Sequence, residues 1–224
     1  MNILFISLAP VFIILFYVYS RDKYEREPWK MLLKALLIGG LVSVPTVFIE
    51  MFLSSFAPEP KISNAAYTAF VVAGFTEESL KYLAFIFIIW NSKHFNEKFD
   101  GIVYAVFISL GFAGIENIIY VSEGNTSVGL FRALTAVPAH ALFGVTMGYY
   151  FGLARFFPDH RKLYLMYAYI IPIVLHGFYN FCLMSEHYLF LILFIPFVAY
   201  LWITGFRKMK YLSDRSIYRD VSEQ

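Results

Sequence analysis

The chain has 224 residues, of which 59% are hydrophobic, 20% aromatic and only 15% charged, and its formal net charge is +2. Soluble domains are usually about 25% charged and about 45–50% apolar, so this composition indicates a membrane protein. The small net charge, without zinc-finger or P-loop spacing, gives no reason to expect nucleic acid as a partner. The single cysteine, Cys182, excludes an internal disulfide framework.

Apolar stretches long enough to cross ~30 Å of hydrocarbon as helices recur along the whole chain. We expect seven spans, at approximately 2–20, 31–57, 65–90, 101–121, 130–154, 163–184 and 188–206. The first has no basic residues before it, which favours an uncleaved span over a signal peptide. The sequence therefore predicts an all-α, polytopic helical membrane protein, with one transmembrane domain over 1–206 and a short charged tail over 207–224.

Basic residues predict the orientation of the spans. Fifteen of the 18 Lys and Arg residues lie beside the first, third and fifth connections or after the last span, and only Lys61 and Arg132 flank the opposite face. Because basic residues concentrate on the cytoplasmic side, we expect the N-terminus outside and the C-terminus in the cytoplasm.

The third span carries ionisable residues in its apolar run, in the segment EESLK (77–81). On a helix Glu77 and Lys81 are four residues apart and Glu78 and Lys81 three, so both carboxylates can reach one ammonium. A single Glu–Lys pair could simply hold helices together. Two carboxylates sharing one lysine leave a surplus negative charge, which is typical of proton-transfer sites. Glu50, in the second span, has no obvious intrahelical partner, and we interpret it as structural.

In the fourth span, small residues at 101, 105, 109 and 113 form a stripe that favours close helix packing. Asn117 continues this line and Glu116 lies on the adjoining face, so both should point into the bundle. Asn117 alone is more typical of an interhelical hydrogen bond than of catalysis.

In the fifth span, His140 lies at the start of a helix face with the pattern GxxxGxxxG, which favours close packing. Pro138 can loosen the helix at this point. We interpret Arg132 as an anchor whose side chain extends to the outer membrane surface. In the sixth span, His176 and Asn180 share one helix face and can serve one site, or can hydrogen-bond without doing chemistry.

Taken together, four spans each place Glu, His or Asn on an inward face. Carboxylate and imidazole bases with His or Asn donors suit the activation of water and the stabilisation of an oxyanion. The same residues could hold a divalent metal such as zinc, although the HExxH signature is absent. A proton- or ion-coupled transporter would also carry intramembrane Glu and His residues, and a non-catalytic scaffold could use the glycine faces.

Several segments resemble the PrsW family of bacterial membrane proteases, in the wider clan of CAAX prenyl endoproteases and Abi proteins. The resemblance lies in EESLK (77–81), FAGIEN (112–117), AHALFGVTMG (139–148) and LHGFYNF (175–181), with weaker likeness in YEREPW (24–29) and FDGIVYA (99–105). It implies an endopeptidase of the bacterial cell membrane that makes the first cut in a single-span anti-sigma factor. The predicted orientation independently places the Glu and His candidates between the middle of the bilayer and its outer third, so we expect the cut near the extracellular boundary of the substrate.

The resemblance also implies which residues carry the chemistry. The implied catalytic residues are Glu77, Glu78, Glu116, His140 and His176, and the supporting residues are Lys81, Asn117 and Asn180. Metal candidates are Glu77, Glu116, His140 and His176. Lys81 and Glu116 stand where the prenyl endoproteases have arginine and histidine, whereas the spacing of His176 and Asn180 resembles theirs and favours an oxyanion role for that pair.

Overall fold

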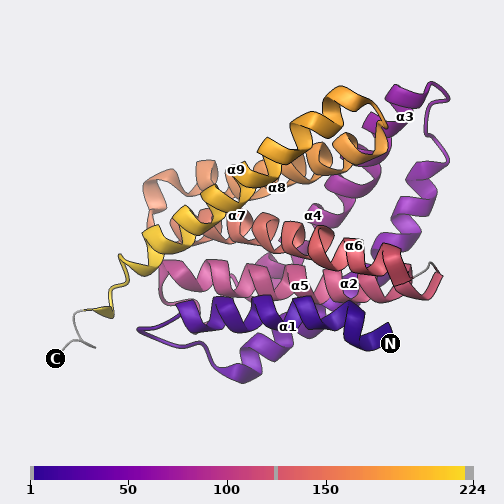
Figure 1. Cartoon of the computed structure of the whole chain (residues 1–224). Coiled ribbons are helices and arrows are strands. Elements are labelled where there is room, and N and C mark those ends of the chain that lie inside the picture. Colours follow the sequence, from indigo (N-terminus) through magenta and orange to yellow (C-terminus); the bar gives the residue numbers. More distant parts are fainter. Residues whose placement is uncertain (1–2, 124–125, 220–224) are drawn as a thin grey trace.

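The computed structural model describes residues 3–123 and 126–219, with side chains for 7–122 and 130–219, and these residues form helices and no strands (Figure 1). The helices are α1 (Ile3–Arg21), α2 (Trp29–Ser54), α3 (Lys61–Tyr67), the π-helix η1 (Thr68–Phe75), α4 (Thr76–Ile88), α5 (Lys98–Glu123), α6 (Thr126–Leu134), α7 (Ala136–Phe156), the 3₁₀ turn η2 (Pro158–His160), α8 (Arg161–Met184) and α9 (Tyr188–Ser213). The polytopic helical fold is thereby confirmed.

Each predicted span corresponds to a helical segment, but two segments are interrupted. The third span is divided among α3, η1 and α4, and the fifth among α6 and α7. The break at Thr135 lies three residues before Pro138, whose ring cannot donate to the carbonyl of residue 134. Pro138 thus falls in the first turn of α7, where backbone N–H groups have no intrahelical partner in any case.

Five helical segments are long and apolar enough to cross a membrane: Trp29–Ser54, Lys98–Ser122, Leu130–Phe156, Pro158–Met184 and Tyr188–Ser213. The stretch Ser7–Arg21 in α1 is apolar but shorter. The number of crossings and their direction therefore stay predictions.

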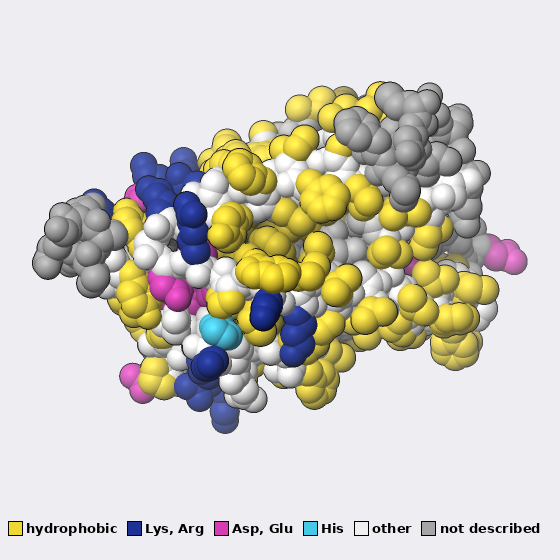
Figure 2. Space-filling view, turned by 90° about the horizontal axis from the view of Figure 1, so that it is seen from below, with side chains coloured by type: hydrophobic (Ala, Val, Ile, Leu, Met, Phe, Trp, Pro, Cys, Tyr) yellow, Lys and Arg dark blue, Asp and Glu magenta, His cyan; other side chains and the backbone are white. Residues whose placement is uncertain are grey.

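The two ends of the bundle differ in charge. In Figure 1 the α1–α2 connection and the C-terminus lie at one end, and the α2–α3 connection lies at the other. On the face drawn in Figure 2, Lys and Arg side chains gather towards the first of these ends, and apolar side chains cover much of the rest. This charge distribution is the one expected if the basic end faces the cytoplasm.

Helix α5 forms the centre of the bundle and packs against its neighbours through glycines. A Cβ atom at Gly148 of α7 would overlap the backbone of Gly101, and one at Gly111 would overlap the backbone of Leu36 in α2. A Cβ at Gly144 would lie 2.8 Å from the Ser109 hydroxyl. The small-residue stripes predicted on the fourth and fifth spans therefore face each other, and they fix the spacing of the helices that carry Glu116 and His140.

We predict that Gly148→Ala destabilises the protein by about 1–3 kcal/mol, since an added methyl group must push α5 and α7 apart. The measurement is the thermal unfolding midpoint of purified protein in detergent. Gly114→Ala is the matched control, because a Cβ there would make an ordinary 3.4 Å contact with Leu8. Equal midpoints for the two variants would mean that the α5–α7 contact tolerates extra volume.

Candidate active site

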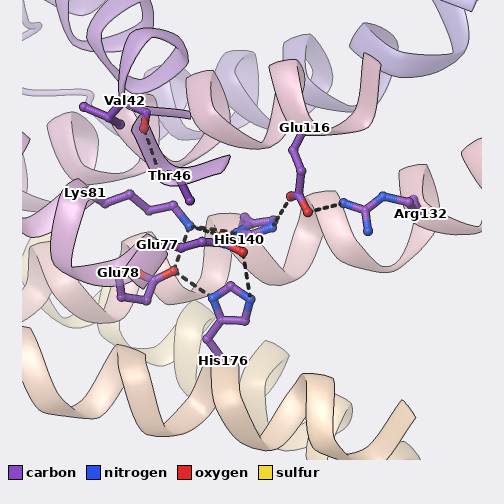
Figure 3. A network of polar contacts seen from close by, with 9 residues as sticks. All are labelled: Val42, Thr46, Glu77, Glu78, Lys81, Glu116, Arg132, His140 and His176. Atoms are coloured by element: carbon purple, nitrogen blue, oxygen red, sulfur yellow. Dashed lines mark hydrogen bonds and ion pairs between the residues drawn. The ribbon is translucent and has the colours of Figure 1, made fainter. Parts of the chain in front are cut away.

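Six of the predicted site residues come together from four helices, α4, α5, α7 and α8 (Figure 3): Glu77, Glu78, Lys81, Glu116, His140 and His176. Glu77 and Glu78 follow directly on η1, which is eight residues long. π-helical turns are rare and frequently lie at functional sites. Gly74 allows η1 to approach α8 closely, because a Cβ at this position would lie 3.0 Å from the backbone nitrogen of Gly177. The acidic pair is thereby held against the helix that carries His176.

Lys81 lies at the centre of the cluster and is fully buried. Its Nζ donates to Glu77 Oε2 at 3.1 Å and to Glu78 Oε1 at 2.8 Å, as the helical spacing predicted. A third contact joins Nζ to His140 Nδ1 at 3.0 Å. An ammonium has three donors and no acceptor, so the Nδ1 atom of His140 is the acceptor and its proton is on Nε2.

Each histidine is held by a carboxylate through one ring nitrogen. His140 Nε2 donates to Glu116 Oε2 at 3.0 Å, and His176 Nδ1 lies 3.0 Å from Glu78 Oε1. An ionised carboxylate can only accept, so His176 donates from Nδ1 and its Nε2 is left with a lone pair. His140 Nδ1 and His176 Nε2 both face Glu77, each 3.9 Å from one of its two oxygens.

Arg132 is part of this network, which corrects our interpretation of it as a surface anchor. One of its terminal nitrogens lies 2.9 Å from Glu116 Oε1, and its guanidinium stacks 3.8 Å from the centre of the Tyr120 ring. Arg132 therefore holds the Glu116 carboxylate in place, and Glu116 in turn orients the His140 ring through Nε2. Arg132 precedes His140 by eight residues in the sequence, but its pairing with Glu116 depends on how α6 packs beside α5.

A pocket of about 620 Å³ opens onto the cluster. Its walls include Glu77, Glu116, His140, His176 and Asn180, together with Arg132 and Glu50, which the sequence analysis had set aside as structural. The lining residues from α2 lie within 47–54, those from α5 within 116–120 and those from α8 within 176–184. In each of these helices they belong to the half that lies away from the basic end. Water can therefore reach the cluster from the side predicted to be extracellular.

Three predicted residues lie outside the pocket wall: Lys81, Glu78 and Asn117. Glu78 is fully buried behind Glu77 and contacts Lys81 and His176. Asn117 donates from Nδ2 to the backbone oxygen of Ser7 in α1 at 3.2 Å, so it joins α5 to α1 and does not meet the other site residues. Asn180 differs from Asn117, because it lines the pocket.

The cluster has the composition of a metal-binding site. One ligand atom from each of Glu77, Glu78, His140 and His176 lies within 4.8 Å of the other three. Metal-binding histidines usually donate their second N–H to a carboxylate or a carbonyl, as both histidines do here. Glu78 Oε2 is buried with no partner among the described residues, and two His with a Glu are a known ligand set for catalytic zinc.

The residues therefore fit a divalent metal, with two conditions set by the geometry. Lys81 occupies the lone pair of His140 Nδ1, so metal binding through this atom must displace the ammonium. Glu116, which the sequence analysis included among the metal candidates, lies on the far side of the His140 ring and is placed to orient that ring.

Comparisons with known proteins agree on one family. A family model described as PrsW family intramembrane metalloprotease matches residues 27–203. The protein named Protease PrsW from Clostridioides difficile (strain 630) is 40% identical to this chain over 95% of the chain and 92% of its own length. Those of Oceanobacillus iheyensis and Bacillus subtilis (strain 168) are 36% and 37% identical, over 97% and 91% of the chain and 99% and 92% of their own lengths. No solved structure matches significantly.

We predict that Lys81→Met lowers the stability of the protein by about 3–5 kcal/mol, because it leaves two buried carboxylates without their counter-charge. The readout is again the thermal midpoint in detergent. Lys61→Met is the control: its partner is Glu186, and both side chains are largely exposed, so its midpoint should stay close to wild type. If the two variants unfold at the same temperature, Lys81 does not hold the cluster in place.

Proposed function

This chain belongs to the PrsW family of intramembrane metalloproteases, and from this premise we propose that it makes the first, extracytoplasmic-side cut in a single-span anti-sigma factor. It is a multi-pass bacterial membrane protease. The proposal adds the substrate, the side of cleavage and the residues that carry the reaction. In this role the cut would begin regulated intramembrane proteolysis and lead to release of the sigma factor.

The observation that carries the mechanism is the position of Glu77. Of the two adjacent carboxylates it alone lines the pocket, and its oxygens face both imidazoles. We assign to it the attacking water, which it orients and from which it takes the proton. Glu78 remains behind it, where it holds His176 and Lys81 in place.

His140, His176 and one carboxylate of the Glu77–Glu78 pair are the residues that would hold a divalent ion, with zinc favoured by the nitrogen ligands. When bound, such an ion polarises the scissile carbonyl and acidifies its water. The protein's own contribution is to keep both imidazoles in one tautomer through Glu116 and Glu78.

Asn180 is the best-placed donor for the oxyanion. It lies one helical turn beyond His176 and lines the pocket, where its amide can donate to a substrate oxygen. Both nitrogens of His176 already face carboxylates, which assigns the oxyanion role more strongly to Asn180 than to the histidine. A peptide carbonyl entering from the pocket would therefore meet Asn180 on one side and Glu77 on the other.

The first test is cleavage in liposomes of a single-span anti-sigma factor by purified protein. Wild type should release a fragment whose new terminus maps near the extracytoplasmic membrane boundary. Glu77→Gln should lower the rate by roughly 10²–10⁴-fold, the usual contribution of a general base. Glu59→Gln, which changes a carboxylate in the α2–α3 connection, should cleave like wild type.

Three outcomes contradict different parts of this proposal. Unaltered cleavage by Glu77→Gln removes Glu77 from the chemistry. A new terminus on the cytoplasmic side overturns the orientation. No cleavage of any anti-sigma factor by active, folded protein overturns the substrate assignment.

Asn180→Ala should lower kcat by about 10²–10³-fold with little change in substrate binding, because an oxyanion donor strengthens its bond in the transition state. Single-turnover rates and binding of the substrate to the Glu77→Gln background separate the two quantities. Asn117→Ala is the matched control, since its amide serves α1: it should lower stability and leave kcat per folded molecule unchanged. Weakened binding with normal single-turnover chemistry would instead make Asn180 a substrate-positioning residue.

A further inference from the structure

A second group of acidic residues lies at the basic end of the bundle, far from the pocket along α5. We call it the acidic cluster: Asp22, Glu25, Glu27, Glu97 and Asp100. Four of these side chains are at most 3% exposed, and Glu25 is half-buried. They come from the α1–α2 connection, from the connection before α5 and from the first turn of α5.

Part of each buried carboxylate is satisfied by neutral donors. Asp100 Oδ2 accepts from the backbone nitrogens of Asn96 at 2.8 Å and Glu97 at 2.7 Å. Glu27 Oε2 accepts from the hydroxyl of Tyr104, and Asp22 Oδ2 accepts from the backbone nitrogen of Glu27. These bonds hold the side chains in fixed positions without neutralising them.

The remaining oxygens receive no hydrogen bond from a neutral or cationic donor. Among the described residues this holds for Glu27 Oε1, Asp100 Oδ1, Asp22 Oδ1 and Glu25 Oε2, all of them buried. The side chains of Glu27 and Asp100 lie within hydrogen-bond distance of each other, a contact that needs a proton between the two carboxyl groups. No Lys, Arg or His side chain that the structure describes lies within ion-pair distance of any member of the cluster, although Arg26 and Lys98 are near. Buried carboxylates without counter-charge are costly, so this arrangement calls for a cation.

We propose that Glu25, Glu27 and Asp100 bind a hard divalent cation of the Ca²⁺ or Mg²⁺ type, at a site separate from the Glu/His cluster. One oxygen of each residue lies within 4.8 Å of the other two. This spacing is about twice a Ca–O distance of roughly 2.4 Å, so one ion can reach all three. A donor set made only of oxygen selects hard cations, whereas the imidazoles of the other site favour zinc.

A cation in this position would fasten the ends of three segments. Asp100 precedes Gly101, the residue that packs against Gly148 of α7, while Glu25 and Glu27 belong to the α1–α2 connection. The segment after α9 joins the same region, since Ser216 donates to Glu97 at 2.5 Å and Ser213 donates to the backbone oxygen of Arg21. The bound ion would stabilise the end of the bundle that the basic residues predict to be cytoplasmic.

Thermal unfolding of the full-length chain in detergent, freed of metal by a chelator, tests the site. Saturating Ca²⁺ or Mg²⁺ should raise the midpoint of wild type by roughly 5–10 °C, the shift expected for a ligand at about 100 times its Kd. Glu77→Gln and Glu59→Gln should keep this shift. Asp100→Asn and Glu27→Gln should lose it, and equilibrium dialysis should show one Ca²⁺ or Mg²⁺ fewer per chain.

The proposal is overturned if neither ion raises the wild-type midpoint, or if Asp100→Asn and Glu27→Gln respond like wild type. If these variants do not fold, the thermal midpoint of Glu25→Gln with and without the ion tests the site, because the half-buried Glu25 is the proposed ligand most tolerant of change. The loss of the shift in this variant supports the site, and a shift equal to that of wild type overturns it. The outcome is independent of cleavage of an anti-sigma factor, so the two proposals can fail separately.

Discussion

The ion-paired contact of Lys81 with Glu77, Glu78 and His140 is the constraint on which the site depends. In a membrane span, a buried carboxylate pair persists only with a counter-charge close by. Lys81 supplies that charge from within the same helix, so one of the two negative charges is balanced as soon as α4 forms. Its third donor reaches His140 on α7, and the ammonium lies 4.2 Å from the centre of the Phe112 ring on α5. One side chain thus links three helices.

Close backbone packing gives this contact its precision. Glycines at the α5–α7, α2–α5 and η1–α8 contacts let backbones meet with no side chain between them, which leaves little freedom for the helices to slide. His140 lies one turn before Gly144 on the same face of α7, and Glu116 lies beyond the buried half of α5. The distance of 3.0 Å between their side chains follows from that packing.

Much of this arrangement can be predicted from the sequence, because it depends on local periodicity. The reach of Glu77 and Glu78 to Lys81, the small-residue stripes, and the inward position of His140 and His176 all follow from residues three or four apart.

Contacts between helices that are distant in the sequence do not follow from this local periodicity. Pairing of Arg132 with Glu116, the presence of Glu50 in the pocket wall and the use of Asn117 for α1 each require the helix order and tilt, which no single span encodes. Nor does composition predict the π-helix at Thr68–Phe75, which reads as an ordinary apolar helix. Residue types alone would also suit a proton-coupled transporter, and it is the similarity to the PrsW family that decides for a protease.

Charge balance relates the two acidic sites to each other. At the pocket, Glu77, Glu78 and Glu116 face two tethered cations, Lys81 and Arg132, so with ionised carboxylates and neutral imidazoles the group carries one excess negative charge. That charge is small enough for burial, yet it would attract a divalent ion to the residues that could hold one. At the opposite end, no Lys, Arg or His side chain among the described residues forms an ion pair with the acidic cluster, so that cluster lacks a tethered cation of this kind. In our proposal the pocket keeps its built-in cations because a reaction there needs room for water and substrate, whereas a divalent ion balances the acidic cluster. Because Lys81 is part of α4, its charge stays close to Glu77 and Glu78 when the pocket exchanges its contents.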